Sequence, residues 1–221
     1  MRGLIALLAL MLLSAAAPAR DWTRVVALSP QGGHVVGNPG ARVKIVEYAS
    51  YTCSHCGQFA AESKVALAQR IRSGSTSIEY RHLLLNGLDL AAVILARCEG
   101  PKRFAALHEA FFESQSAWLR RGSDFARDNA AALASATPPV QMRTWADGAG
   151  LTAIARAKGG LTGPGIDRCF ADRAALDRIV AAWSPARAAA AGVSSTPSFF
   201  VNGRKTEVHD WSGLEPLLDA R

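Results

Sequence analysis

Val43-Lys44-Ile45-Val46-Glu47-Tyr48 leads through a short link into Cys53-Ser54-His55-Cys56, and this junction is the most informative part of the chain. The first segment is rich in β-branched and aromatic residues and predicts a buried strand. Gly57 to Arg72 follow as a predicted helix, whose larger apolar residues lie on or near one face: Phe59, Val65 and Ile71. The two cysteines are therefore expected where a strand gives way to a helix.

A helix N-terminus favours a thiolate, because its backbone N–H groups are unpaired and the helix dipole is positive there. Cys53 precedes the helix proper and is predicted to be the exposed nucleophile of low pKa, whereas Cys56 lies in the first turn as the shielded resolving thiol. His55 stands between them and, when protonated, adds a charge and a donor that favour the Cys53 thiolate. We therefore expect a redox-active pair of oxidising character.

Two other interpretations of this cysteine pair are a zinc site and an inert structural disulfide. A zinc knuckle needs a second close pair of ligands, but Cys98 and Cys169 are isolated and no histidine pair at metal-ligand spacing accompanies them. A disulfide that closes so short a loop constrains the unfolded chain little and so contributes little to stability. The spacing therefore favours redox chemistry and predicts no metal site.

The N-terminus predicts export. Met1-Arg2 is a short positive start, Leu4 to Leu13 is an unbroken apolar run, and the small residues Ser14 to Ala19 end in Ala-x-Ala, which is the layout of a secretory signal. A permanent membrane anchor is the weaker alternative, because the apolar run is shorter than the ~20 residues that cross a bilayer. We expect cleavage near Ala19, a periplasmic location and no stable membrane insertion.

Export changes the interpretation of the four cysteines. Thiols outside the cytoplasm are oxidised unless they are held reduced, so an even number of cysteines predicts disulfides. Four cysteines permit three pairings. The short spacing of Cys53 and Cys56 favours a redox disulfide there, which leaves Cys98 and Cys169 as a structural disulfide.

The composition is that of a folded chain with a basic surface. Of the 221 residues, 49% are hydrophobic and 19% are charged, which is typical of a protein that buries a core. Lys and Arg number 25 and Asp and Glu 18, for a formal net charge of +7. Apart from Arg120-Arg121 and Arg204-Lys205, the cations stand singly or beside acids. Nucleic-acid binding is therefore not expected.

A second informative segment lies far along the chain. Thr196-Pro197 precedes the strand-like residues Ser198 to Val201, and Asn202-Gly203 joins them to a returning strand over Arg204 to Val208. Asn-Gly favours the positive φ angles of a tight hairpin turn. A proline is tolerated at the start of a strand because it need not donate a hydrogen bond there. We therefore predict a β-hairpin that is preceded by a proline.

This order of features resembles the DsbA family of exported thiol-disulfide oxidoreductases, which have a thioredoxin fold with a helical insertion. The likeness extends from about Val35 to Leu218 and rests on the strand, the Cys-x-His-Cys motif, the helical excursion and Thr-Pro followed by Ser-Phe-Phe-Val-Asn-Gly. It implies that Cys53 attacks, that Cys56 resolves, and that Pro197 is a cis-proline facing the pair.

The resemblance also implies a role for Glu47 and a set of partners. Glu47 matches a buried acid under the active site that assists proton transfer with Cys56; a solvated strand end is the alternative for this residue. The expected substrates are unfolded exported proteins with free cysteines, and the expected reoxidising partner is a membrane protein resembling DsbB. No cofactor is expected.

Two residues depart from the best-known members of the family. Ser54 stands where they have proline, and Thr196 precedes the proline where they have valine; threonine there is common among isomerases and reductases of the wider fold. Three functions therefore stay open. The favoured one is an oxidase that introduces disulfides into folding periplasmic proteins. The others are a disulfide reductase or isomerase, and a non-enzymatic binding module, against which the intact cysteine pair and its proline argue.

The domain organisation follows from these landmarks. Thr76 to Leu84 predict a second strand, so we expect an α/β thioredoxin-like domain, a central mixed sheet flanked by helices, over residues 20–85 and 192–221. Residues 86–191 are alanine-rich and predict an inserted all-helical domain that packs on the sheet. Its landmarks are an amphipathic helix at Phe104, Leu107, Phe111 and Phe112, a break at Pro138-Pro139, and a kink or a new helix at Ser184-Pro185.

Several other residues have ordinary explanations. His82 and His108 fit packed or surface histidines better than ligands. The glycines of Gly159-Gly160 and Gly163-Pro164-Gly165 predict a turn-rich loop without the spacing of a phosphate-binding loop, so no nucleotide site is expected. Tyr51, beside the cysteine motif, fits either a peptide groove or the core.

Overall fold

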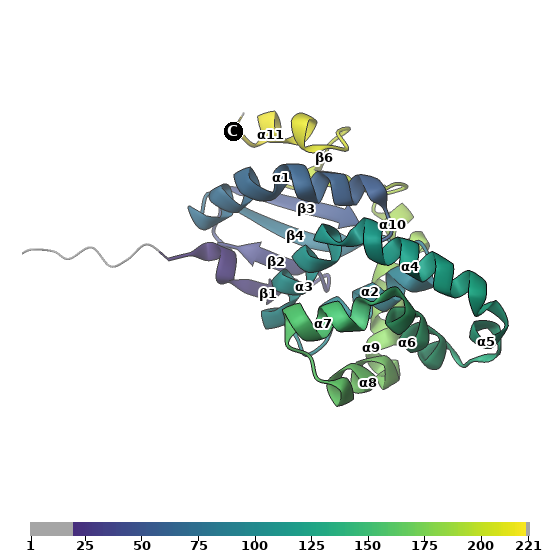
Figure 1. Cartoon of the computed structure of the whole chain (residues 1–221). Helices are drawn as coiled ribbons and strands as arrows, with labels where there is room; N and C mark the ends of the chain where they lie inside the picture. Colours follow the sequence, from purple (N-terminus) through teal and green to yellow (C-terminus); the bar gives the residue numbers. More distant parts are fainter. Residues whose placement is uncertain (1–19, 220–221) are drawn as a thin grey trace, which may run out of the picture.

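The computed structural model describes residues 20–219 and has a six-stranded mixed sheet at its centre (Figure 1). The predicted signal segment, residues 1–19, lies outside the described range. The strands are β1 (Val26–Leu28), β2 (His34–Gly37), β3 (Val43–Ala49), β4 (Thr76–His82), β5 (Ser198–Val201) and β6 (Arg204–Lys205). They run in the order β1-β2-β4-β3-β5-β6, with β3 parallel to β4 and antiparallel to β5.

Helices α1 (Ser54–Arg72) and α11 (Trp211–Asp219) cover one face of the sheet (Figure 1). Apolar residues of both helices meet those of the strands in one hydrophobic core, because β-strand side chains alternate between the two faces and every second residue points toward these helices. The members of this core include Ile45, Ile78, Phe59, Phe199 and Leu214.

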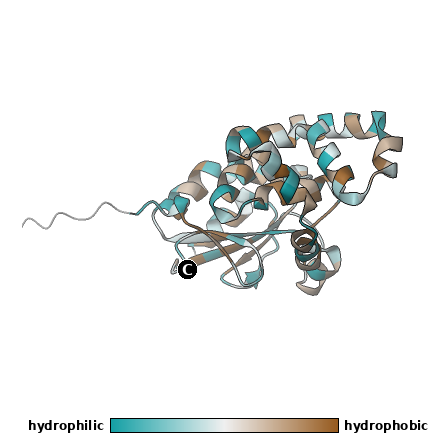
Figure 2. Ribbon diagram, turned by 90° about the horizontal axis from the view of Figure 1, so that it is seen from below, coloured by the Kyte–Doolittle hydropathy of each residue, from teal (hydrophilic) through white to brown (hydrophobic). Residues whose placement is uncertain are grey.

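The residues between β4 and β5 are helical and gather beside the sheet (Figure 1). Hydrophobic and hydrophilic residues alternate along these helices (Figure 2), as expected of helices with one buried face. A second core joins them to Tyr48, Ala49 and Leu83 of the sheet region, so the helices pack on the sheet. Their bounds are α2 (Gly87–Arg97), α3 (Pro101–Glu113), α4 (Gln115–Asp128), α5 (Ala130–Ser135), α6 (Pro138–Ala149), α7 (Leu151–Gly159), α8 (Gly163–Ala171), α9 (Arg173–Trp183) and α10 (Pro185–Ala190).

The predicted fold class, a thioredoxin-like sheet with helices inserted in it, is confirmed. The Asn202-Gly203 turn has positive φ angles of 49° and 81° and joins β5 to β6 as predicted, although β6 is shorter than the expected strand. Pro138 begins α6, and Ser184 caps the new helix α10 by accepting a hydrogen bond from the N–H of Arg187. Strands β1 and β2 and the short 3-10 helix Trp22–Arg24 had not been predicted.

Two local expectations are wrong. Val65 does not lie on the buried face of α1 and is 68% exposed. The helix has 3.6 residues per turn, so Val65, midway between the buried residues Ser63 and Leu67, points to the opposite side. The buried face of α1 is formed by Phe59, Ser63, Leu67 and Ile71. The segment Gly163-Pro164-Gly165 is the first turn of α8 and not a loop. Thr162 starts this helix by accepting a hydrogen bond from the N–H of Gly165 at 3.1 Å.

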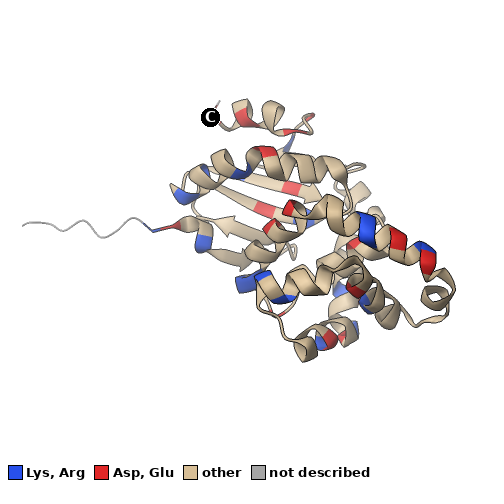
Figure 3. Cartoon of the chain, in the orientation of Figure 1, with Lys and Arg blue, Asp and Glu red and all other residues tan. Residues whose placement is uncertain are grey.

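Charged residues are scattered along the chain, with Lys and Arg mixed among Asp and Glu (Figure 3). Several form ion pairs, such as Lys64 with Glu109 at 2.8 Å and Arg70 with Asp219 at 2.8 Å. Exposed pairs of this kind contribute about 0–1 kcal/mol each to stability. Within residues 20–219, no helix is both long enough and apolar enough to cross a membrane.

Candidate active site

The two cysteines of the motif lie at the N-terminus of α1, which begins at Ser54, earlier than the predicted Gly57. Cys53 is the N-cap residue and has an extended backbone, with φ −88° and ψ 119°. Cys56 lies in the first turn and is fully buried, whereas Cys53 is partly exposed. Both are free thiols. The structure thus presents one sulfur to solvent and shields the other.

The pKa of Cys53 is lowered from 9.0 to about 5. The largest cause is the thiol of Cys56, which hydrogen-bonds to the Cys53 sulfur; the side chain of Thr196 and the backbone N–H groups of Cys56 and His55 add to it, against the effect of burial. These groups all stabilise a thiolate at the end of the helix. The imidazole of His55 is not among these groups, so tuning by that ring stays a prediction.

The pKa of Cys56 moves in the opposite direction and is raised far above its usual value. Burial is the first cause, followed by the hydrogen bond to Cys53 and the negative charges of Glu47 and Cys53. Cys56 therefore stays protonated when Cys53 is a thiolate. This difference in ionisation gives the two sulfurs different chemistry.

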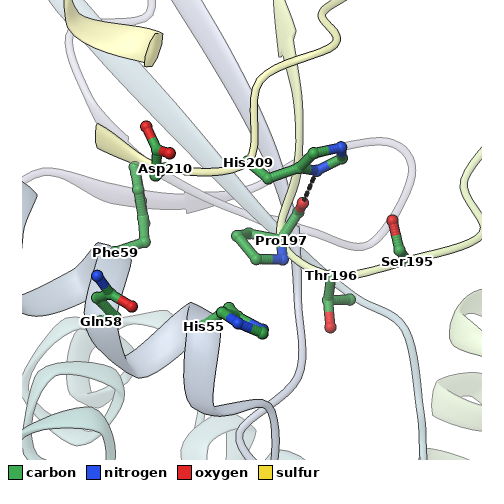
Figure 4. Close-up of a pocket in the computed structure, with 8 residues that line it drawn as sticks. All are labelled: His55, Gln58, Phe59, Ser195, Thr196, Pro197, His209 and Asp210. Carbon is green, nitrogen blue, oxygen red and sulfur yellow. Dashed lines mark hydrogen bonds between the residues drawn. The ribbon is translucent and has the colours of Figure 1, made fainter. Parts of the chain in front are cut away.

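The loop that precedes β5 faces the cysteines. The peptide bond between Thr196 and Pro197 is cis, and the Cys53 thiol donates a hydrogen bond to the Thr196 carbonyl oxygen at 3.3 Å. His209 donates from Nδ1 to the Pro197 carbonyl oxygen at 2.8 Å (Figure 4). Residues from two distant parts of the sequence are therefore held together around Cys53.

A pocket of about 340 Å³ lies beside this loop (Figure 4). His55 and Pro197 lie on facing sides of it, with the His209 ring on the far side of Pro197. The lining residues are His55, Gln58, Phe59, Ser195, Thr196, Pro197, His209 and Asp210.

Glu47 is buried under the active site, with 2% of its surface exposed, so its alternative interpretation as a solvated strand end is wrong. It continues the row of β3 side chains that includes Val43 and Ile45 on the α1 face of the sheet. Burial and then the negative charge of Cys53 raise its pKa from 4.5 to about 8. Glu47 also lines a hollow of about 770 Å³ between α1 and α3.

Two residues of the helical region reach the active-site loop and had not been predicted. Asp89 accepts hydrogen bonds from Ser50 Oγ at 2.7 Å and from the Tyr51 N–H at 2.8 Å. Burial raises the pKa of Asp89 to about 6. Gln115 donates to two carbonyl oxygens of the same loop. Asn86 followed by Asp89 is a helix-start signal in the sequence, but no sequence signal shows that these side chains reach Ser50 to Cys53.

Three further residues belong to the core. Tyr51 is 1% exposed and its hydroxyl lies 3.0 Å from Nδ1 of His108, so it packs inside and does not form a groove. Burial lowers the pKa of His108 to about 3 and the pKa of His82 well below its usual value.

Cys98 and Cys169 form a disulfide between the end of α2 and α8. These two cysteines are therefore not available as further zinc ligands for the Cys53 pair.

Known proteins share this architecture. A family model described as Thioredoxin matches residues 29–220. A curated relative from Rickettsia bellii, named "Putative protein-disulfide oxidoreductase", is 27% identical over 187 residues, which are 84% of this chain and 62% of the relative. The chain thus spans about three-fifths of the length of that relative.

Solved structures extend the comparison. The structure of a protein-disulfide isomerase from Novosphingobium aromaticivorans is 30% identical, with a TM-score of 0.78 over 86% of this chain and 97% of the other. The structure of Wolbachia pipientis alpha-DsbA1 is 21% identical, with a TM-score of 0.65 over 87% and 92% of the two chains, and shares the fold. The chain belongs to the thioredoxin family.

Proposed function

We propose that the protein is a thiol-disulfide oxidase, whose oxidised Cys53–Cys56 pair passes a disulfide to a reduced substrate protein. A substrate thiolate attacks the sulfur of Cys53, which forms a mixed disulfide and releases Cys56 as a thiolate. The second thiolate of the substrate then attacks the substrate sulfur that is bonded to Cys53. The substrate thereby gains its disulfide, and Cys53 leaves as a thiolate. Two electrons pass to the cysteine pair, and Cys56 takes up a proton.

The opposite pKa shifts of the two cysteines carry this proposal. A pKa of about 5 for Cys53 stabilises the reduced pair, because its thiolate forms readily, and it makes Cys53 a good leaving group. Each pKa unit of thiolate stabilisation corresponds to about 30 mV in a two-electron couple. A pair whose reduced form is stabilised in this way has a strongly oxidising disulfide.

Glu47 supplies the proton for Cys56 in this scheme. With a pKa of about 8, its carboxyl group is protonated at neutral pH and lies under α1, and its ionised form raises the pKa of Cys56. The hollow that it lines between α1 and α3 offers a place for water through which Glu47 regains its proton. Transfer to Cys56 prevents the released thiolate from attacking the mixed disulfide again.

A disulfide isomerase is the second candidate. Thr196 before the cis-proline and the name of the Novosphingobium neighbour favour it. An isomerase starts from the reduced pair, with the Cys53 thiolate attacking a wrong disulfide of the substrate, so a pair that is kept reduced by its partner would point to this function. A binding module without catalysis gains no support from the ionisation of Cys53.

The proposed site of action is the periplasm, after removal of residues 1–19, on unfolded exported proteins with free cysteines. The disulfide between Cys98 and Cys169 supports this placement, because structural disulfides form and persist in oxidising compartments. Reoxidation of the Cys53–Cys56 pair requires an electron acceptor, for which we propose a membrane partner resembling DsbB.

Oxidation of a reduced, unfolded test protein with two cysteines tests the proposal. We expect the oxidised protein, in stoichiometric amount, to form the disulfide of the test protein far faster than oxidised glutathione does, with one reduced Cys53–Cys56 pair appearing for each disulfide made. A reduced form that instead reshuffles a scrambled substrate, together with an oxidised form that transfers no disulfide, would establish the isomerase. Absence of both activities would leave only the binding module.

A further inference from the structure

Gln115 links the helical region to the active-site loop. It is the first residue of α4 and is 7% exposed. Its Nε2 donates to the carbonyl oxygen of Tyr51 at 2.9 Å and to that of Cys53 at 2.8 Å. A single amide group from another part of the fold thus binds the backbone on both sides of Thr52.

The Cys53 carbonyl matters because it starts α1. The same oxygen accepts the N–H of Gly57 at 3.2 Å. The orientation of Cys53 therefore depends on its backbone. The N–H groups of His55 and Cys56, which lower the pKa of Cys53, lie in the same turn and act only when the sulfur is aligned with them.

Gly57 gives an independent indication of this contact. A Cβ at position 57 would collide with the Oε1 of Gln115, so the glycine leaves room for the amide against the first turn of α1. The backbone of Tyr51 is also held twice, since Asp89 accepts from its N–H at 2.8 Å while Gln115 donates to its carbonyl. The loop before Cys53 is therefore fixed from the helical side.

We propose that Gln115 is a positioning residue for the reaction of Cys53. It holds the Cys53 carbonyl so that the sulfur faces the N–H groups of α1 and the loop at Thr196. In this way the helical region controls the reactivity of the nucleophile without touching the substrate. The inference deepens the proposed function and rests on Cys53 being the attacking sulfur.

The test replaces Gln115 by Met, which keeps a similar shape and removes the amide. We expect the midpoint of the thiolate absorbance titration of Cys53 to rise by about half to one pH unit, the equivalent of one lost hydrogen bond. Alkylation of Cys53 by iodoacetamide near the original midpoint should slow by a few-fold. Gly57→Ala, which displaces Gln115, should shift the midpoint in the same direction and serves as a second variant if Gln115→Met folds poorly.

Gln141→Met is the matched control, because Gln141 is a helical glutamine whose Nε2 also donates to a backbone carbonyl, that of Leu133 at 3.0 Å, away from the cysteines. Its Cys53 titration should match that of the parent protein. If Gln115→Met and Gly57→Ala also titrate like the parent, Gln115 is only structural and the inference fails. Titration and alkylation need no protein substrate, so this failure is distinct from a failure of the oxidase activity.

Discussion

Cys53 and Cys56 differ in ionisation although they share one turn of helix. Cys53 is partly exposed at the N-cap and receives hydrogen bonds from the turn that follows, whereas Cys56 is buried, and burial is the first cause of its raised pKa. An attacking sulfur has to be a thiolate and accessible, and a resolving sulfur has to be kept from reacting first. The positions of the two residues meet both needs.

Single substitutions of the cysteines should separate these roles. Cys53→Ser should abolish turnover, because the accessible nucleophile is gone. Cys56→Ser should accumulate mixed disulfides with substrate proteins on Cys53, because no resolving thiol remains. Non-reducing electrophoresis and mass spectrometry of the adducts check this. Adducts that form with Cys53→Ser but not with Cys56→Ser would reverse the assignment.

Glu47 should make stability depend on pH. Its pKa is raised from 4.5 to about 8 on folding, so the folded protein binds more protons than the unfolded chain in this window and the free energy of unfolding falls as pH rises through it. In the reduced protein, where the Cys53 charge contributes to this shift, the free energy of unfolding of Glu47→Gln should fall by about 2–4 kcal/mol less than that of the parent between about pH 5 and about pH 8. Urea unfolding at both pH values measures it; parallel losses in the parent and the variant would contradict the burial of a neutral Glu47.

His55 is the residue for which sequence and structure emphasise different atoms. The place of His55 between the two cysteines predicts that its imidazole stabilises the thiolate, whereas the structure shows its backbone N–H in that role. His55→Ala keeps the N–H and removes the ring. If the ring contributes, the Cys53 titration should move to higher pH and the pair should become less oxidising. An unchanged titration would leave the stabilisation to Cys56, Thr196 and the backbone alone.

The residues that carry chemistry were partly predictable. Cys53, Cys56 and Pro197 stand in local motifs that predict a helix start and a hairpin. The sequence was therefore enough to identify them as candidate active-site residues. Asp89 and Gln115 were not found, because their partners are backbone atoms distant in sequence. From the sequence alone, any other polar residue at the start of a buried helix would have been an equally good candidate for these contacts.

At the scale of elements, strong patterns were predicted well and weak ones were not. β3, β4 and β5 are dense in β-branched or aromatic residues, and their positions match the prediction closely. β1 and β2 are short, and β1 has partly exposed residues, so their pattern does not stand out from a loop. Gly163 to Gly165 were predicted as a loop but form the first turn of α8, because glycine and proline also occur in the first turn of a capped helix.

The disulfide between Cys98 and Cys169 should staple α2 to α8 and take no part in turnover. The two residues are separated by 71 positions, so the chain-entropy model gives a stabilisation on the order of 4 kcal/mol. Because Cys98 is 3% exposed, mild reduction should open the Cys53–Cys56 pair first. Mass spectrometry after alkylation decides: label on Cys98 or Cys169, at low reductant or without reductant, would contradict a stable structural bridge.

At the scale of the whole molecule, the helical region and the sheet act as one unit around the active site. One hydrophobic core runs from Tyr48 and Ala49 of β3 through Cys56 into the helices α2 and α3. Asp89 of α2 and Gln115 of α4 add hydrogen bonds to the loop before Cys53. The helical region therefore does more than cover the sheet, since it fixes the backbone from which the nucleophile projects.

The redox potential of the Cys53–Cys56 pair distinguishes an oxidase from a reductase. The purified protein is equilibrated with glutathione buffers of known ratio, and the fraction of the reduced pair is read after alkylation. Since the thiolate of Cys53 stabilises the reduced form, we expect a potential nearer to the about −120 mV of DsbA than to the about −270 mV of thioredoxin. A value near that of thioredoxin would contradict the oxidase and favour a reductase.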